Sequence, residues 1–172
     1  MYDNMVNKFK WGNMDKSEVY QGTETERMSL NYRSMYARLA NALIAEGKKE
    51  DALKTLDRCM EAMPHESILL NFSATGIAEA YYKLDQFEKG NAVALKLADV
   101  YGQEIDYYAR LDRNEVKRLG NEAEIAMSVM QKLLILAKMY KQDDVLEQLE
   151  ARFADLESKY LDSPMSKNWV FG

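Results

Sequence analysis

The sequence predicts an all-α fold, built as a right-handed stack of antiparallel helix pairs. Two prolines and eight glycines in 172 residues leave long stretches able to be helical. Leu, Ala, Met, Glu and Lys dominate the middle of the chain. Apolar and small residues recur there three and four positions apart, which places them on one face of a helix.

One segment carries the pattern most clearly, so a first repeat is expected near residues 33–66. It joins a helix at 28–46 to a second helix at 49–62. Bulky and small residues follow in a fixed order, namely Tyr36, Leu39, Ala40, Leu43, Ala52 and Leu56, before Pro64 closes the segment. Small residues stand where two helices must approach closely, and proline cannot continue a helix. This order and spacing are those of a tetratricopeptide repeat.

One helix pair cannot bury its own apolar face, so further copies are expected. A second copy is predicted near 71–104, with helices at 70–84 and 87–111. Its motif Ile77-Ala78 follows Leu39-Ala40 by 38 residues.

A third copy, predicted near 130–163, is weaker and has helices at 122–141 and 144–161. Its motif Leu136-Ala137 follows that of the second copy by 59 residues. The repeat family has a period of about 34 residues. A plain helical hairpin that matches by chance is therefore the alternative. The surplus residues predict a loop at 114–121.

Both ends of the chain lack a helical period. Residues 1–27 are expected as an irregular lead-in to the helical domain at 28–162, and residues 163–172 as an irregular tail. Phe9 and Trp11 are expected to pack on the first helix pair. The apolar residues of the tail are expected to dock on the last helix or on a larger protein.

The charge pattern bears on partners. The net charge is −5, and acidic and basic residues alternate along the predicted helices. Nucleic-acid binding draws most of its affinity from basic side chains on phosphates, so no nucleic-acid partner is expected. No stretch approaches the roughly 18 apolar residues of a membrane span, so direct membrane insertion is not expected.

Residues with catalytic chemistry are sparse. His65 is the only histidine and lies in a predicted turn, and Cys59 falls at a small, buried position of the repeat. A metal site needs several ligands at suitable spacing, and buried thiols are unreactive. We therefore expect no catalytic residue, no metal and no cofactor, and the chain is not expected to be an enzyme.

Binding is the remaining function. In this repeat the first helix of each pair lines a concave face, and the predicted groove consists of Asn41, Phe72, Glu79, Tyr82 and Lys138. Chaperone-binding relatives hold a lysine and an asparagine where this chain has Ala37 and Gly76, so capture of a peptide carboxylate is not expected. A mixed groove suits an extended or helical peptide. The alternative is a groove filled by the chain's own termini.

The lead-in contains the run Asn4-Met5-Val6-Asn7-Lys8-Phe9-Lys10-Trp11-Gly12-Asn13-Met14. With the turn at 43–49 and the helical segments 56–60 and 78–82, it resembles the C-terminal region of large Bacteroidetes-type membrane proteins of unknown function. The polytopic N-terminal part of those proteins is similar to protein O-mannosyltransferases. The resemblance covers about residues 4–160.

The resemblance implies a soluble fragment of a longer protein, on the periplasmic side of the inner membrane. Its partner would then be a protein or peptide, such as the membrane part of its own parent chain. The catalytic carboxylates expected for that family would lie in the membrane part, and none corresponds to a position here.

Three hypotheses follow. The favoured one is a non-catalytic helical-repeat module for protein–protein interaction. The second is an accessory domain that directly assists a membrane-bound lipid-linked-sugar glycosyltransferase. The third is a free-standing enzyme.

Overall fold

The computed structural model describes residues 1–20, 22–118 and 121–161. These residues form seven α-helices, two short helical turns of other types and their connections, with no strand among them. The all-α prediction is confirmed. The predicted tail at 163–172 lies outside the described residues.

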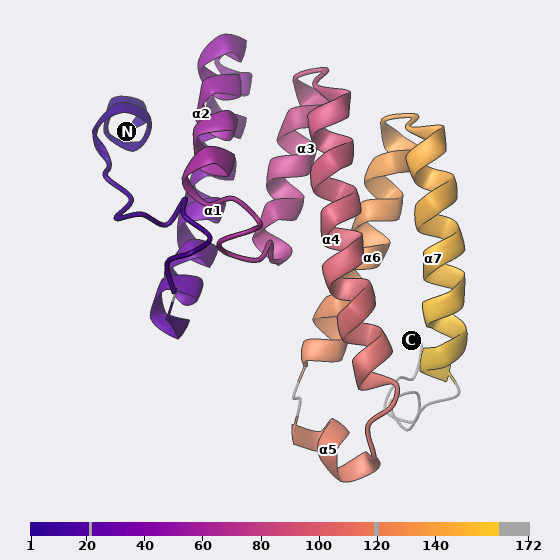
Figure 1. The fold of residues 1–172 in the computed structure, drawn as a ribbon. Coiled ribbons are helices and arrows are strands. Elements are labelled where there is room, and N and C mark those ends of the chain that lie inside the picture. Colours follow the sequence, from indigo (N-terminus) through magenta and orange to yellow (C-terminus); the bar gives the residue numbers. More distant parts are fainter. Residues whose placement is uncertain (21, 119–120, 162–172) are drawn as a thin grey trace. The chain divides into compact units, whose positions relative to one another are not determined.

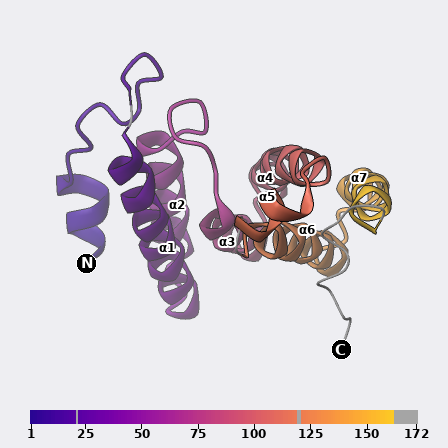
Figure 2. The ribbon, with the colours of Figure 1, turned by 90° about the horizontal axis from the view of Figure 1, so that it is seen from below.

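The chain divides into two compact units, Met1–Ala94 (unit 1) and Leu95–Gly172 (unit 2). In unit 1, helices α1 (Thr23–Ala45) and α2 (Lys49–Ala62) form an antiparallel pair (Figures 1 and 2). Helix α3 (Thr75–Lys83) pairs with the beginning of α4 (Phe87–Tyr108). A π-helical turn, η1 (Asn4–Lys8), precedes α1, and a 3₁₀ turn, η2 (Phe72–Ala74), leads directly into α3.

Small residues lie where the helices of unit 1 pack. Ala40, Ala52 and Ala78 each have 0% of their surface exposed, as their places in the repeat pattern predict. Their size lets the helix backbones approach closely, and Tyr36 and Leu56 fill the space beside them, also fully buried.

The lead-in is shorter and more ordered than the sequence predicted. Helix α1 begins at Thr23, five residues before the expected start at 28, and η1 is helical within the expected irregular segment. The Trp11 ring meets Tyr32 edge-on at 5.0 Å and lies 5.9 Å from the Tyr36 ring. Trp11 therefore packs on α1 as predicted.

A buried arginine fixes the connection between the two helix pairs of unit 1. The Arg33 guanidinium donates hydrogen bonds to the carbonyls of Met63, Ile68 and Leu69, at 3.0, 2.7 and 2.7 Å. Arg33 is fully buried, and desolvation lowers its pKa. Loop carbonyls thus replace the water that this charge loses.

Unit 2 contains the rest of α4, then α5 (Arg113–Arg118), α6 (Glu122–Met139) and α7 (Asp143–Leu161). The expected loop at 114–121 is wrong in part, because α5 lies there. Its start is a capping box: Asp112 Oδ1 accepts the N–H groups of Asn114 and Glu115, and Glu115 Oε2 accepts the Asp112 N–H. Asp112 and Glu115, three residues apart, are the sequence signal for this start.

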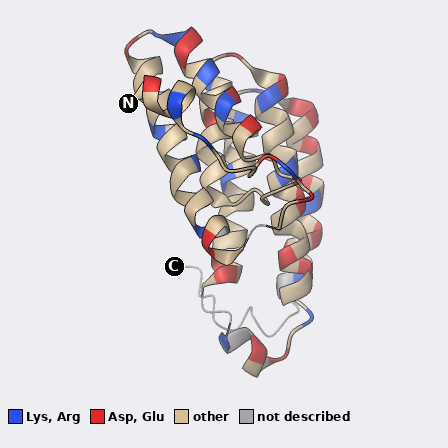
Figure 3. Ribbon diagram, turned by 60° about the vertical axis from the view of Figure 1, so that its left-hand side comes forward, with Lys and Arg blue, Asp and Glu red and all other residues tan. Residues whose placement is uncertain are grey.

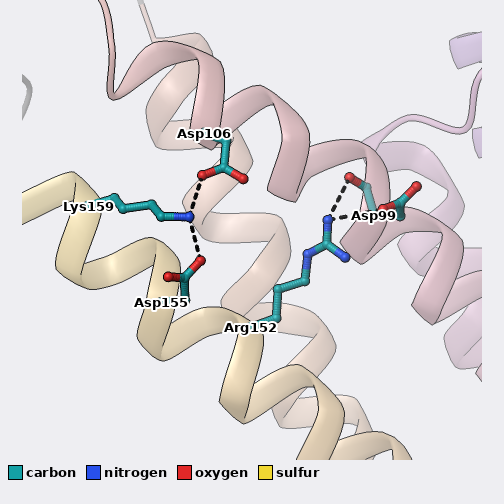
Figure 4. A network of polar contacts seen from close by, with 5 residues as sticks. All are labelled: Asp99, Asp106, Arg152, Asp155 and Lys159. Carbon is teal, nitrogen blue, oxygen red and sulfur yellow. Dashed lines mark hydrogen bonds and ion pairs between the residues drawn. The ribbon is translucent and has the colours of Figure 1, made fainter.

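Ion pairs join α7 to α4 within unit 2 (Figure 4). Arg152 Nη2 lies 3.0 Å from Asp99 Oδ1. Lys159 Nζ lies 2.8 Å from Asp106 Oδ1 and 2.6 Å from Asp155 Oδ2. All of these side chains are partly exposed, so solvent and salt weaken the pairs.

Within the described ranges, no helix combines the length and apolar character needed to cross a membrane.

Candidate functional site

The predicted groove residues fall in both units. Asn41, Phe72, Glu79 and Tyr82 belong to unit 1, whereas Lys138 is exposed near the end of α6 in unit 2. Four of the five predicted residues therefore share one compact unit.

Two of the four predicted residues are joined through a lysine. Lys83 Nζ donates to Asn41 Oδ1 at 2.8 Å and lies 3.0 Å from Glu79 Oε1. Asn41 is further oriented by its Nδ2, which donates to the Ala37 carbonyl at 2.8 Å. An amide, an ammonium and a carboxylate thus meet where α1 packs on α3.

An apolar edge lies at the start of α3. Phe72, in the 3₁₀ turn η2 that leads into α3, is 48% exposed and stands seven residues before Glu79. Leu69, three residues earlier, is 65% exposed. We call Asn41, Leu69, Phe72, Glu79 and Lys83 together the α1/α3 face. Sequence reasoning missed Leu69 because it lies in the connection rather than in a periodic helix.

Tyr82 does not line this face, and that prediction is wrong. Its side chain is 1% exposed, and its hydroxyl donates to Asn91 Oδ1 at 2.9 Å. A Cβ built on Gly90 would lie 2.5 Å from Tyr82 Cε1. Tyr82 therefore occupies the space that the glycine leaves between α3 and α4. In the sequence, Gly90 inside the predicted helix at 87–111 is the feature that indicates a large side chain packed opposite it.

Ala37 and Gly76, the two residues compared above with chaperone-binding repeats, lie against each other. A Cβ on Gly76 would lie 3.2 Å from Ala37 Cβ, and Ala37 is buried. The two helices come into direct contact at this point, so a side chain at position 76 would meet Ala37.

The N-terminal aromatics lie elsewhere on α1. Trp11 contacts Tyr32 and Tyr36. At 100° per residue, Tyr36 points about 140° around the helix from Asn41. The N-terminal segment thus follows a different side of α1, and the C-terminal residues lie outside the described part.

Unit 1 also contains a pocket that the sequence did not predict. A pocket of about 450 Å³ opens between α2, α3 and α4 and is lined by Asp57, Met60, Glu61, Tyr81, Lys89, Ala92 and Val93. We call it the α2/α4 pocket. Asp57 accepts a hydrogen bond from the Tyr81 hydroxyl at 2.9 Å and pairs with Lys89 at 2.7 and 2.8 Å.

Cys59 and His65, the two residues considered as possible catalytic groups, both lie within the packed structure of unit 1. Cys59 is fully buried, and burial raises its pKa to about 12, so it is a neutral thiol. His65 Nδ1 accepts the Leu70 N–H at 3.3 Å, inside the loop that Arg33 binds. In the part of the chain that the structure describes, no three His, Cys, Asp or Glu side chains gather as a metal site requires.

Charged residues of both signs are interspersed along the helices (Figure 3). Comparison of the chain with protein family models, curated protein sequences and solved structures gave no match.

Proposed function

We propose that the chain is a non-catalytic interaction module that binds polypeptide through the α1/α3 face. The observation that carries the proposal is the composition of that face. Lys83 holds Asn41 and Glu79 together, and Phe72 is exposed in the 3₁₀ turn that leads into the same helix, α3. An extended or helical peptide offers polar groups to such a triad and a side chain to the aromatic edge.

The proposal includes a tetratricopeptide-repeat-like architecture. Its support is the packing of α1 on α3, with fully buried small residues at the repeat positions Ala40, Ala52 and Ala78. In such repeats the first helices of successive pairs line one binding surface. Asn41 and Glu79 are contributed by those two helices.

The expected affinity is modest. An exposed face must order a flexible peptide, and that entropic loss offsets much of the contact energy. The Lys83 ammonium must also exchange part of its bonding to Asn41 and Glu79 for bonds to the ligand. A partner tethered nearby would raise the effective concentration and make weak binding sufficient.

An accessory role beside a membrane glycosyltransferase stays a prediction from the sequence resemblance. In that role the same face would hold acceptor polypeptide or the catalytic part. Sequencing upstream of Met1 in the parent reading frame tests it, because the prediction requires membrane spans there.

The test of the main proposal is selection from a phage-displayed library of random peptides on the native chain. Enriched peptides are then measured against two variants of the face, Leu69→Ser/Phe72→Ser and Lys83→Ala. Both variants change exposed side chains, and circular dichroism checks that they fold. We expect the peptides to bind the native chain and to lose most of their affinity for both variants.

The matched control is Ile135→Ser/Met139→Ser, which removes two exposed apolar side chains from α6 (59% and 54% exposed). Peptides lost on this control but kept by the face variants would place binding on unit 2 and contradict the proposal. So would a library that yields no enriched peptide. Turnover of a sugar donor by the purified chain would contradict the proposal that the chain is not an enzyme.

A further inference from the structure

The α2/α4 pocket has an apolar floor of defined shape. Tyr81 and Val93 are buried in it, and Met60 adds a flexible thioether. The Tyr81 hydroxyl is fixed on Asp57, and burial beside that carboxylate raises its pKa, so it stays a donor at neutral pH. The ring therefore presents a fixed surface to whatever enters.

The rim of the pocket carries one carboxylate with bonding capacity left. Both Asp57 oxygens are bound by Lys89, whose ammonium also lies 5.8 Å from the centre of the Tyr81 ring. Glu61 differs, because its ion pair with Arg58 spans 3.8 Å, beyond hydrogen-bond length, and its side chain is 69% exposed. Lys89 already neutralises Asp57. Arg58, the distant partner of Glu61, does not line the pocket, so Glu61 is the lining carboxylate that a cation at the rim can bind.

The shape of the pocket indicates the kind of occupant. Its volume falls within the range of ligand sites, but small molecules are bound where most of their surface can be buried. An open pocket on a helical surface instead fits one side chain that projects from a larger partner. We propose that the α2/α4 pocket receives a bulky apolar side chain of a partner polypeptide, with an adjacent lysine or arginine of the partner bound to Glu61.

This proposal concerns a second site and does not rest on the function proposed for the α1/α3 face. The probe is a short dye-labelled peptide with tryptophan followed by lysine in a glycine background. Two matched peptides replace the lysine with glutamate or the tryptophan with glycine. Fluorescence anisotropy measures binding to the native chain at low salt.

We expect the tryptophan–lysine peptide to bind with a Kd below about 1 mM. Glutamate in place of lysine should weaken binding about fivefold, as an exposed ion pair allows, and glycine in place of tryptophan about tenfold or more. Glu61→Gln should abolish the preference for lysine over glutamate while leaving the requirement for tryptophan. Equal binding of the lysine and glutamate peptides, or no binding by the native chain at 1 mM, would overturn the proposal.

Two tryptophan substitutions locate the site. Ala92 is exposed on the pocket wall, so Ala92→Trp should fill the pocket and weaken the peptide about tenfold or more. The control, Ala154→Trp, places the same side chain at an exposed alanine of α7 and should leave binding unchanged. Undiminished binding to the Ala92 variant would exclude the pocket. If that variant misfolds by circular dichroism, the Glu61→Gln result decides.

Discussion

Two helix junctions, one in each unit, use different chemistry: that of α1 with its neighbours in unit 1, and that of α7 with α4 in unit 2. In unit 1, alanines at the helix crossings and the buried Arg33 join α1 to its neighbours away from water. In unit 2, α7 is tied to α4 by partly exposed ion pairs of Arg152 and Lys159 (Figure 4). Contacts of the first kind tolerate salt but not changes of volume, whereas those of the second kind tolerate changes of volume but not salt.

Helix α4 shows the contrast within one element, because it contributes a glycine to each unit. Gly90 of unit 1 faces the buried Tyr82 ring. Gly102 of unit 2 faces the Arg152 side chain, which is partly exposed and flexible. Gly90 thus makes room for a buried aromatic ring, and Gly102 makes room for a long side chain at the surface.

The largest effect is expected at Arg33 of unit 1. Arg33→Met keeps the apolar volume but removes the donors from three loop carbonyls, and each such loss costs about 1–3 kcal/mol. We expect a loss of roughly 3–5 kcal/mol in the free energy of unfolding, measured with urea. The control is Arg38→Met, at an exposed position of the same helix, which should change stability by less than about 0.5 kcal/mol. Equal urea midpoints for the two variants would show that the hydrogen bonds of Arg33 do not stabilise unit 1.

The next effect compares the two glycines of α4. Gly90→Ala puts a methyl group 2.5 Å from Tyr82 Cε1, and the ring is held by its bond to Asn91. Overpacking should outweigh the gain in helix propensity and leave a net loss of about 1–2 kcal/mol. Gly102→Ala only displaces Arg152, so the propensity gain should make it neutral or slightly stabilising. Thermal melts of both variants check the difference in sign, and a loss at Gly102 as large as at Gly90 would contradict it.

A smaller effect is expected from the ion pairs of unit 2. Arg152→Gln removes a partly exposed pair with Asp99, which contributes less than about 1 kcal/mol. Because salt screens such pairs, the deficit should shrink further in 1 M NaCl, where the Debye length is about 3 Å. Urea midpoints of the native chain and the variant at two salt concentrations measure this. A deficit that is independent of salt would show that Arg152 acts through packing over Gly102 instead.

The smallest effect depends on pH. Burial, and then the charge of Glu122, raise the pKa of Glu104 above its ordinary value of 4.5. The folded unit 2 thus binds this proton more tightly than the unfolded chain, so stability falls as pH rises from 4.5 through the raised pKa. Glu104→Gln should match the native chain near pH 4 and exceed it in stability at pH 8. If the stabilities of the native chain and of Glu104→Gln change with pH in parallel, the pKa of Glu104 is not raised in the folded chain.

Much of unit 1 could be predicted from the sequence because its contacts follow a period. Ala40, Ala52 and Ala78 stand at fixed distances from bulky residues, and close helix packing admits only small side chains there. The outlines of α2 and α4 followed from the same stripes, with α2 matching its expected bounds of 49–62.

Contacts that leave the periodic pattern could not be predicted in this way. Arg33 lies on a helix, but its hydrogen-bond partners are carbonyls of a loop without a periodic pattern. From the sequence alone, a charged residue at that position is expected to be exposed to solvent. Tyr82 was placed in the groove by helical spacing alone, whereas the gap beside Gly90 decides its direction. The α2/α4 pocket depends on three helices meeting, so no single segment encodes it.

The burial of Cys59 makes the opening of the α1/α2 pair measurable without any mutation. It is the only cysteine of the chain, fully buried, with its pKa raised to about 12. A thiol reagent such as an aromatic disulfide can therefore modify it only when α2 separates from the helices that cover it. The labelling rate under native conditions counts those separations. Its dependence on urea shows whether the pair opens alone or only when the whole unit unfolds.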